Sequence, residues 1–162
     1  MRSARGYTLI ELLISLAIVG IVSAIAVPVF IESNARNGIW TGSELIGAQI
    51  RQARLKAISR NLSFRVRFDC PNAGEFRILQ VTGVALIDNA ANRCSAQQLY
   101  DSGVYSMPTG VSFGAVPTLE VSGRGVYTAI GSAIPQIINV TYGASTRSLT
   151  VTATGQITFE AF

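Results

Sequence analysis

The side chains that could do chemistry in this 162-residue sequence are few, because histidine is absent and the nine acidic residues are scattered. Histidine is the commonest general base and metal ligand, so its absence removes the usual catalytic triads. No two carboxylates stand at a spacing that indicates an acid–base pair. The segment Gly123-Arg124-Gly125 is expected to be a turn, since no helix-forming run follows it as in a phosphate-binding loop. We therefore expect that the protein is not an enzyme and that it has neither a cofactor nor a metal site.

The two cysteines, Cys70 and Cys94, are the second candidate for chemistry. They lack the C-x-x-C spacing and the additional cysteines of a zinc site. Both would lie outside the cytoplasm if the apolar N-terminal segment described below crosses a membrane, and thiols oxidise in that environment. We expect a disulfide between them, with a pair of buried free thiols as the alternative.

Six of the 13 basic residues gather within residues 51–67. These are Arg51, Arg54, Lys56, Arg60, Arg65 and Arg67. They could contact the phosphates of a nucleic acid, or they could be charges on the solvated faces of a helix end and an edge strand, some paired with acids of neighbouring molecules. The second interpretation is favoured, and the formal charge of +4 does not by itself imply a nucleic-acid partner, because such binding depends on a clustered patch and not on the total charge.

One carboxylate stands in an unusual place, since Glu11 lies near the start of the apolar segment of residues 7–31. This segment is long enough to cross a membrane, for which about 20 helical residues are needed. Arg2 and Arg5 precede it and are expected to keep that flank in the cytoplasm. A carboxylate inside lipid costs a few kcal/mol, so Glu11 is expected to need a partner.

Three interpretations of this segment compete. A secretory signal peptide could be cleaved after Ala24-Ile25-Ala26 and release a secreted soluble domain. The length of the segment and the presence of Glu11 count against it. A simple membrane anchor explains the length but gives no reason for the carboxylate.

The third interpretation comes from the string GYTLIELLI at residues 6–14, which closely resembles the class III leader junction of type IV pilins and type II secretion pseudopilins. The resemblance implies that prepilin peptidase cleaves between Gly6 and Tyr7 and that Tyr7, in place of the more usual phenylalanine, is N-methylated. Residues 1–6 are then a leader peptide and residues 7–31 a transmembrane assembly helix. Pro28 falls where many pilins also carry a proline, and it is expected to kink the helix.

Cleavage at Gly6 would place a new amino terminus about 6 Å along the helix axis from Glu11. Neighbouring subunits that are staggered along this axis could bring the amine of one beside the carboxylate of the other. We therefore expect Glu11 to pair with the mature N-terminus of an adjacent subunit. The alternative is a glutamate that reaches the nearby membrane interface without a partner.

Helix is expected to resume after Pro28 and to reach residue 60, with its outer half, residues 32–60, belonging to an extracytoplasmic head of residues 32–162. Apolar or small residues recur there at steps of three and four, which predicts a stripe that packs on a sheet, although a surface helix is the alternative. The stripe is Ile39, Ser43, Ile46, Ile50, Ala53 and Ala57. Trp40 and Leu45 are expected to widen it, and the glycines nearby to weaken or bend the helix.

Alternation of apolar and polar residues after Asn61 predicts that residues 61–162 form a small antiparallel β-sheet. Strands are expected at residues 62–68, 75–81, 99–105, 110–115, 118–121, 137–142, 148–152 and 156–159. Residues 87–98 are expected to form a polar loop held at Cys94. The predicted fold is thus α+β, with a long kinked N-terminal helix packed on the sheet.

The end of the predicted helix is similar to that of the GspH/FimT group of minor pseudopilins, in its pairs Ala53-Arg54, Ala57-Ile58 and Arg60-Asn61. Residues 121–125 and 147–155 resemble the C-terminal hairpin of that group, with its Thr154-Gly155 step. Some members are thought to bind DNA through basic residues near this last turn, where the present chain has Gly155-Gln156-Ile157-Thr158.

The resemblance implies a structural subunit of the bacterial inner membrane with a cytoplasmic N-terminus and a periplasmic head. Such a minor subunit helps to initiate or cap a type II secretion pseudopilus or a type IV pilus. Its expected partners are other pilin or pseudopilin subunits, prepilin peptidase and the inner-membrane assembly platform. The alternative is a recognition module at the filament tip that binds DNA or a secreted substrate.

Overall fold

The computed structural model describes residues 7–160, and the predicted leader and cleavage site before Tyr7 lie outside them. The chain divides into two compact units, Met1–Ala35 and Arg36–Phe162. A single helix, α1 (Leu9–Arg60), begins in the first unit and continues into the second. The helix is therefore almost as long as expected, and it begins two residues later than Tyr7.

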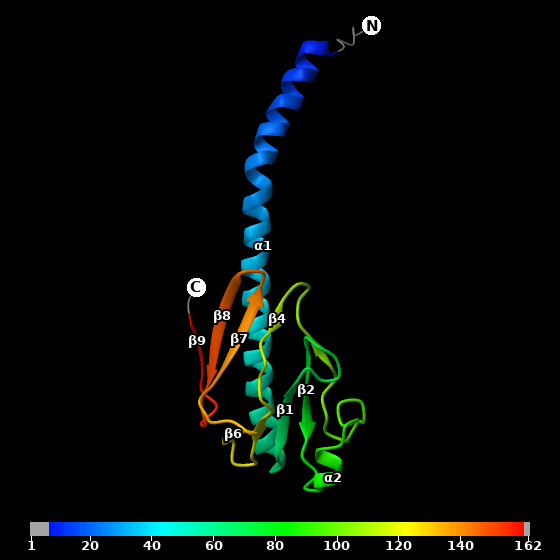
Figure 1. The fold of residues 1–162 in the computed structure, drawn as a ribbon, viewed down its shortest axis with the longest axis vertical. Helices are drawn as coiled ribbons and strands as arrows, with labels where there is room; N and C mark the ends of the chain where they lie inside the picture. Colours follow the sequence, from blue (N-terminus) through cyan, green and yellow to red (C-terminus); the bar gives the residue numbers. More distant parts are fainter. Residues whose placement is uncertain (1–6, 161–162) are drawn as a thin grey trace. The chain divides into compact units, whose positions relative to one another are not determined.

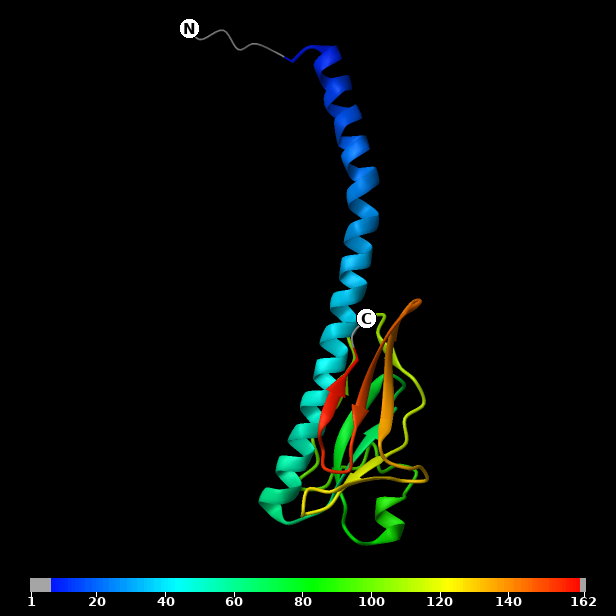
Figure 2. The same cartoon turned by 90° about the vertical axis from the view of Figure 1, so that its left-hand side faces the viewer.

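The second unit holds two antiparallel sheets instead of the one that we expected, and both lie beside the C-terminal half of α1 (Figures 1 and 2). One sheet has the strand order β3-β2-β1-β5-β6 and the other β4-β7-β8-β9. Within residues 7–160 the strands are β1 (Phe64–Phe68), β2 (Glu75–Gln80), β3 (Tyr105–Ser106), β4 (Ser112–Phe113), β5 (Leu119–Val121), β6 (Tyr127–Ala129), β7 (Gln136–Tyr142), β8 (Ser145–Val151) and β9 (Ile157–Phe159). A short helix, α2 (Ala85–Asp88), follows β2.

The predicted stripe of α1 is confirmed as the helix side of the core. All six of its members are fully buried, and the five apolar ones share one cluster with side chains from both sheets, such as Phe64, Ile138 and Leu149. Trp40 is the exception to the widened stripe that we expected, because 52% of its surface is exposed. Burial of one continuous apolar stripe against two sheets is what holds this half of the helix to the head.

Two glycines of α1 allow the close approach of the sheets. A Cβ at Gly47 would lie 2.8 Å from Cζ of Phe159, and one at Gly42 would lie 2.7 Å from Cε of Met107. Both positions therefore serve packing, which explains their place in a helix that they weaken by about 1 kcal/mol each. The local sequence pattern does not distinguish this packing role from the bending that we expected.

Ser43 is the polar member of the stripe, and Arg147 of β8 explains it. The Arg147 guanidinium donates a hydrogen bond to Ser43 Oγ at 2.6 Å, and Ser43 Oγ donates to the Trp40 carbonyl at 2.9 Å. The same guanidinium lies 3.9 Å from the ring centroid of Trp40 and 4.7 Å from that of Phe159. A buried cation is thus held by a hydroxyl and two aromatic faces between α1 and the second sheet.

The end of α1 is set by Asn61, which adopts a left-handed φ of 51°. The Asn61 amide donates to the Ile58 carbonyl, and the Leu62 amide donates to the Ala57 carbonyl. These two bonds form the Schellman arrangement that terminates many helices, with asparagine in the place often taken by glycine. The chain then turns directly into β1, as the change of period at this residue predicted.

The segment between β2 and β3 covers the face of β2 that points away from α1, and a disulfide joins it to the end of β1. Cys70 and Cys94 form this bond, which confirms the expected pairing. Inside the segment, Arg93 and Asp101 form an ion pair of 2.6 Å with side chains 2% and 0% exposed. The hydrogen bond that Arg93 donates to the Asp101 carboxylate raises the pKa of Arg93 above its ordinary value.

Burial alone would raise the pKa of Asp101, but hydrogen bonds from Arg93 and from the backbone amides of Gln98 and Gln80 outweigh burial and lower it.

The predicted strand of residues 99–105 is wrong over most of its length. Asp101 and Ser102 side chains accept hydrogen bonds from the amides of Gln80 and Ile78, so side chains take the donors that a strand ladder would use. Only Tyr105 and Ser106 pair with β2 as a strand.

Other departures are local. Strand β6 was not predicted, because three residues after a glycine-containing turn carry little alternation. Helix α2 was not predicted either, and its first residues precede the loop that we expected at 87–98. The remaining strands lie where the alternation placed them, with shifts of a few residues at their ends.

We expect Tyr127→Phe to lower the free energy of unfolding of the head by about 1 kcal/mol, because the buried hydroxyl of Tyr127 donates to the Ile50 carbonyl of α1. Urea titration of the full chain in nonionic detergent measures it. Tyr142→Phe is the matched control, since no hydrogen bond of its hydroxyl is found among the described residues. Equal effects of the two substitutions would show that the Tyr127 hydrogen bond contributes nothing.

We expect Asp101→Asn to lower the free energy of unfolding at neutral pH by about 3 kcal/mol, because it leaves Arg93 buried without its counter-charge. The folded-state pKa of Asp101 is below its unfolded value, so its contribution is complete above about pH 4 and is lost as the pH falls through the folded pKa. Thermal unfolding between pH 2 and pH 7 should therefore show an acid-dependent loss in the wild type that is smaller in Asp101→Asn. The exposed Glu160→Gln should keep the wild-type profile.

Candidate functional site

The first compact unit presents an apolar surface that the described chain does not cover. From Tyr7 to Ile31, every large apolar side chain is at least half exposed, for example Leu9 at 78% and Phe30 at 67%. The most apolar 18-residue window of α1 has a mean hydropathy of 2.7, and none of it is buried. Residues 9–31 span about 35 Å as a helix, which exceeds the hydrocarbon thickness of a membrane. By length and composition, this part of α1 can cross a membrane.

Thr8 and Glu11 form the start of α1. The Glu11 amide donates to Thr8 Oγ1 at 3.3 Å, so Thr8 is the N-cap and Glu11 occupies the third helical position. Thr-x-x-Glu is the pattern of a capping box, a signal in the sequence that our interpretation of Glu11 did not use. A carboxylate in the first turn also lies at the positive end of the helix dipole. These effects favour helix formation at this point without giving the carboxylate a cationic partner.

The Glu11 carboxylate is exposed, and no ion pair or hydrogen bond of its side chain is found among residues 7–160. Its own carbonyl accepts a hydrogen bond of 2.7 Å from Ser15 Oγ, which occupies the nearest polar side chain on the helix. The residue that we expected to be neutralised therefore has no cation within the described chain. Any partner for it must come from the leader side or from another molecule.

Pro28 lies inside α1, and the helix continues through it without a break. Its missing amide removes one backbone hydrogen bond from the turn that contains it. The kink that we expected at this position stays a prediction.

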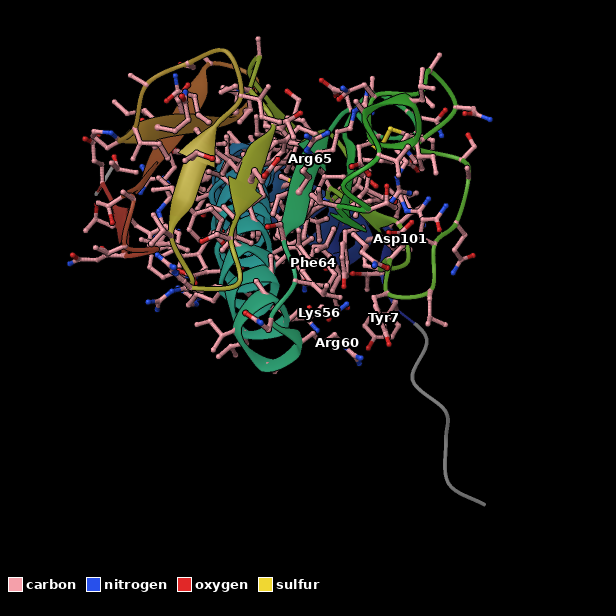
Figure 3. All side chains as sticks on the ribbon, turned by 90° about the horizontal axis from the view of Figure 1, so that it is seen from below. Tyr7, Lys56, Arg60, Phe64, Arg65 and Asp101 are labelled. Atoms are coloured by element: carbon pink, nitrogen blue, oxygen red, sulfur yellow. A yellow bond between two sulfur atoms is a disulfide. The ribbon has the colours of Figure 1, made fainter. Side chains whose placement is uncertain are left out.

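The six basic residues do not form one surface, because they divide between the end of α1 and the outward face of β1. Figure 3 shows Lys56 and Arg60 at the helix end and Arg65 farther along the neighbouring strand. On the helix, Arg51 lies 4.0 Å from Glu44, and Arg60 stacks on the Tyr100 ring with its Cζ 4.0 Å from the centroid.

Arg54 holds the helix to two turns of the head. Its Nε donates to the Gly125 carbonyl at 3.0 Å, and a Cβ at Gly155 would lie 2.8 Å from Arg54 Cδ. Arg65 on β1 donates to Glu120 Oε2 at 2.8 Å. Four of the six cations therefore have carboxylates, carbonyls or rings within the chain, which favours the structural interpretation of the cluster over phosphate contact. Lys56 and Arg67 have no such side-chain partner among the described residues.

Comparison with known proteins gives one match to the N-terminal segment and others to the fold. Residues 1–27 match the family described as the prokaryotic N-terminal methylation motif. No curated protein matches the chain. Among solved structures, the chain is similar to the type IV minor pilin FimU of Pseudomonas aeruginosa, with a TM-score of 0.53 and 16% identity over 78% of this chain and 90% of that chain.

A second solved structure with some likeness is the minor pseudopilin EpsH from the type 2 secretion system of Vibrio cholerae, with a TM-score of 0.48 and 16% identity over 73% of this chain and 92% of that chain. At such low identity, the likeness to FimU establishes the fold only. The matched motif is an independent observation, because it covers residues 1–27, which include most of the apolar segment of residues 7–31. The chain thus carries the N-terminal methylation motif over residues 1–27, and its fold is similar to that of a type IV minor pilin.

Proposed function

We propose that this protein is a minor pilin or pseudopilin, a structural subunit that helps to initiate or cap a type IV pilus or a type II secretion pseudopilus. The observation that carries the proposal is the apolar N-terminal part of α1, which is exposed throughout and contains one carboxylate without a partner in the described chain. A helix of this kind is suited to two apolar environments in turn. It lies in the membrane before assembly and among the helices of other subunits afterwards.

The leader gives the first step of this function. Prepilin peptidase would cleave between Gly6 and Tyr7, remove Arg2 and Arg5 and methylate the new amine of Tyr7. Those two arginines keep the N-terminus in the cytoplasm, so the head is placed in the periplasm. There the bond between Cys70 and Cys94 is chemically stable, which agrees with that orientation.

Glu11 gives the second step. Within a membrane its carboxylate is costly, and pairing with the methylated amine of Tyr7 from an adjacent subunit would offset the cost and set the axial register between subunits. The capping box explains why Thr8 and Glu11 start the helix well, but a capping role does not need the residue to stand in an apolar segment. Pairing between subunits accounts for both its place and its lack of a partner.

The head supplies the specificity of the subunit and no catalysis in this proposal. Four of the six clustered cations are held by groups within the chain, so DNA capture receives no support from them. The inner-membrane assembly platform and other subunits are the proposed partners. Membership of the GspH/FimT subgroup stays a prediction from the helix end and the C-terminal hairpin.

We expect the protein isolated from its host membrane to begin at an N-methylated Tyr7, with residues 1–6 absent. Intact-mass and N-terminal peptide mass spectrometry measure this directly. A chain that retains Met1 would contradict leader cleavage. A chain that begins at Val27 would show that the segment is a secretory signal and that the protein has no anchor.

We expect Glu11→Gln to reduce the amount of the protein in the sheared filament fraction at least tenfold, because the substitution removes the charge that pairs with the neighbouring amine. Its amount in the membrane fraction should not change, since hydrophobicity drives insertion. Immunoblotting of both fractions measures the two effects.

Glu32→Gln is the control, because it removes a carboxylate from the same unit outside the apolar segment. Thr8→Ala separates capping from pairing. If Thr8→Ala and Glu11→Gln reduce incorporation equally, the role of Glu11 is to cap the helix and the pairing proposal is wrong.

A further inference from the structure

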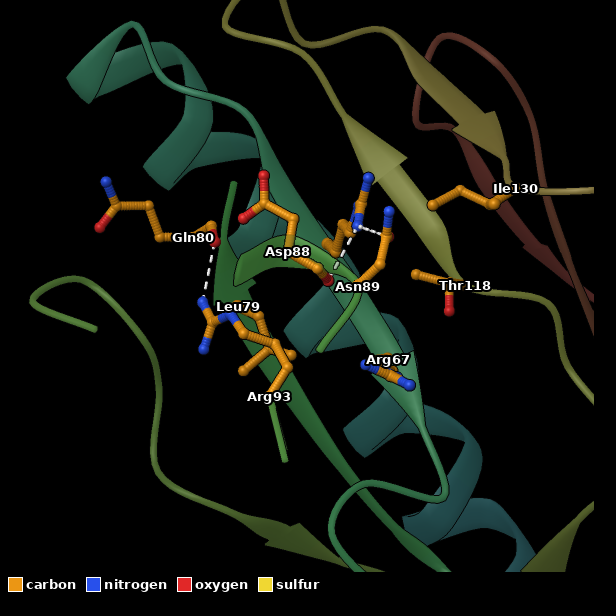
Figure 4. A pocket seen from close by; sticks show the side chains of 9 residues that line it. Arg67, Leu79, Gln80, Asp88, Asn89, Arg93, Thr118 and Ile130 are labelled. Atoms are coloured by element: carbon orange, nitrogen blue, oxygen red, sulfur yellow. Dashed lines mark hydrogen bonds between the residues drawn. The ribbon is translucent and has the colours of Figure 1, made fainter. Parts of the chain in front are cut away.

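A pocket of about 150 Å³ lies on the face of the five-stranded sheet that points away from α1. Strand β1 alternates buried and half-buried residues, so Phe64, Val66 and Phe68 face the core while Arg65 and Arg67 face the pocket. Asp88 at the end of α2, Asn89 and Arg93 form one side, and Thr118 and Ile130 form the other (Figure 4). The pocket is thus built from a rigid strand and a segment that the disulfide holds in place.

The pairing of β1 with its two neighbours places side chains in rows across this face. In one row, Arg65 stands between Leu79 of β2 and Glu120 of β5, and its Nε donates to Glu120 Oε2 at 2.8 Å. Its NH1 group also donates to Asn89 Oδ1 at 3.0 Å. The charge of Arg65 in this row is therefore balanced, because its guanidinium binds a carboxylate and a side-chain amide.

The next row repeats the cation without the anion. Arg67 pairs with Arg77 on β2, and the register of β1 with β5, continued by one residue beyond Leu119, places Thr118 on its other side. A threonine thus stands where the previous row has a carboxylate. Two arginines opposite each other repel, so this row favours an added negative charge. Arg67 has no hydrogen bond or ion pair among the described residues.

The other charged side chains around the pocket already have hydrogen-bond or ion-pair partners within the chain. Arg93 pairs with Asp101, and Arg77 donates to the carbonyls of Ser102 and Cys94. The Asp88 carboxylate accepts from the amides of Thr82 and Gly83 at 2.8 and 3.0 Å. No hydrogen bond or ion pair joins either of these acids to Arg67 among the described residues, and the row that Arg67 shares with Arg77 holds two cations and no acid.

We propose that this pocket is a binding site for a single oxyanion, a carboxylate or a phosphate group, which Arg67 and the Thr118 hydroxyl hold as donors. The guanidinium supplies paired N–H donors that match two oxygens of such a group. The pocket volume of about 150 Å³ admits one such group with a short attached chain. The inference does not depend on the proposed filament function, because it rests on the sheet register, the pocket and the hydrogen bonds around it.

The test uses the full chain in nonionic detergent, with backbone amide NMR signals of Thr118 and Leu79 followed during titration. Inorganic phosphate and sodium acetate are the two probes, each compared with sodium chloride at equal ionic strength. We expect a saturable shift with at least one probe and at least a tenfold weaker response in Arg67→Gln. Saturation by acetate alone identifies a carboxylate site, and saturation by phosphate alone identifies a phosphate site.

Two variants complete the design. Thr118→Glu supplies the missing carboxylate within the chain, as Glu120 does for Arg65, and should abolish the response to both probes in a folded protein. Arg124→Gln removes an exposed arginine outside the pocket and should respond as the wild type does. An unchanged response in Arg67→Gln, or no saturable response of the wild type to either probe, overturns the proposal.

Discussion

The physical constraint on which this protein depends is the need to keep the first half of α1 out of water. Its apolar side chains, from Leu9 to Ile31, have no cover in the described chain, while the core of the head lies entirely beyond them. Burying such a surface is worth about 25 cal/mol for each Å², so a membrane or other helices must supply the cover. In the proposed function, the carboxylate of Glu11 in that segment also requires a cationic partner from another subunit.

The second half of the same helix is stabilised by a different arrangement. One stripe packs against two sheets, small residues such as Gly47 allow the close approach, and Arg147 links the helix to β8 through Ser43. One helix thus carries two surfaces with opposite requirements. The head provides a fixed body, and the N-terminal part is left for partners.

Regular patterns in the sequence predicted most of the fold. The helical stripe, the change to alternation after Asn61 and the positions of β1, β2 and β7 all follow from local periodicity, which reports on burial. The division into two sheets and strand β6 were not predicted, and the strand predicted at residues 99–105 was wrong over most of its length. Strand partners far apart in sequence, and side chains that replace the backbone hydrogen bonds between strands, leave no periodic pattern. β1 pairing with β5 is such a case.

The sequence by itself determined the apolar segment, the N-terminal methylation motif and the candidate carboxylate Glu11, because the cost of charge and apolar surface in water or lipid depends on composition and order alone. Only the tertiary structure decided which arginines have an acidic partner within the chain. Arg65 and Arg67 are equivalent in the sequence pattern, yet the register of β5 places Glu120 beside one and Thr118 beside the other. Pairing of distant strands, which local periodicity does not encode, made that difference.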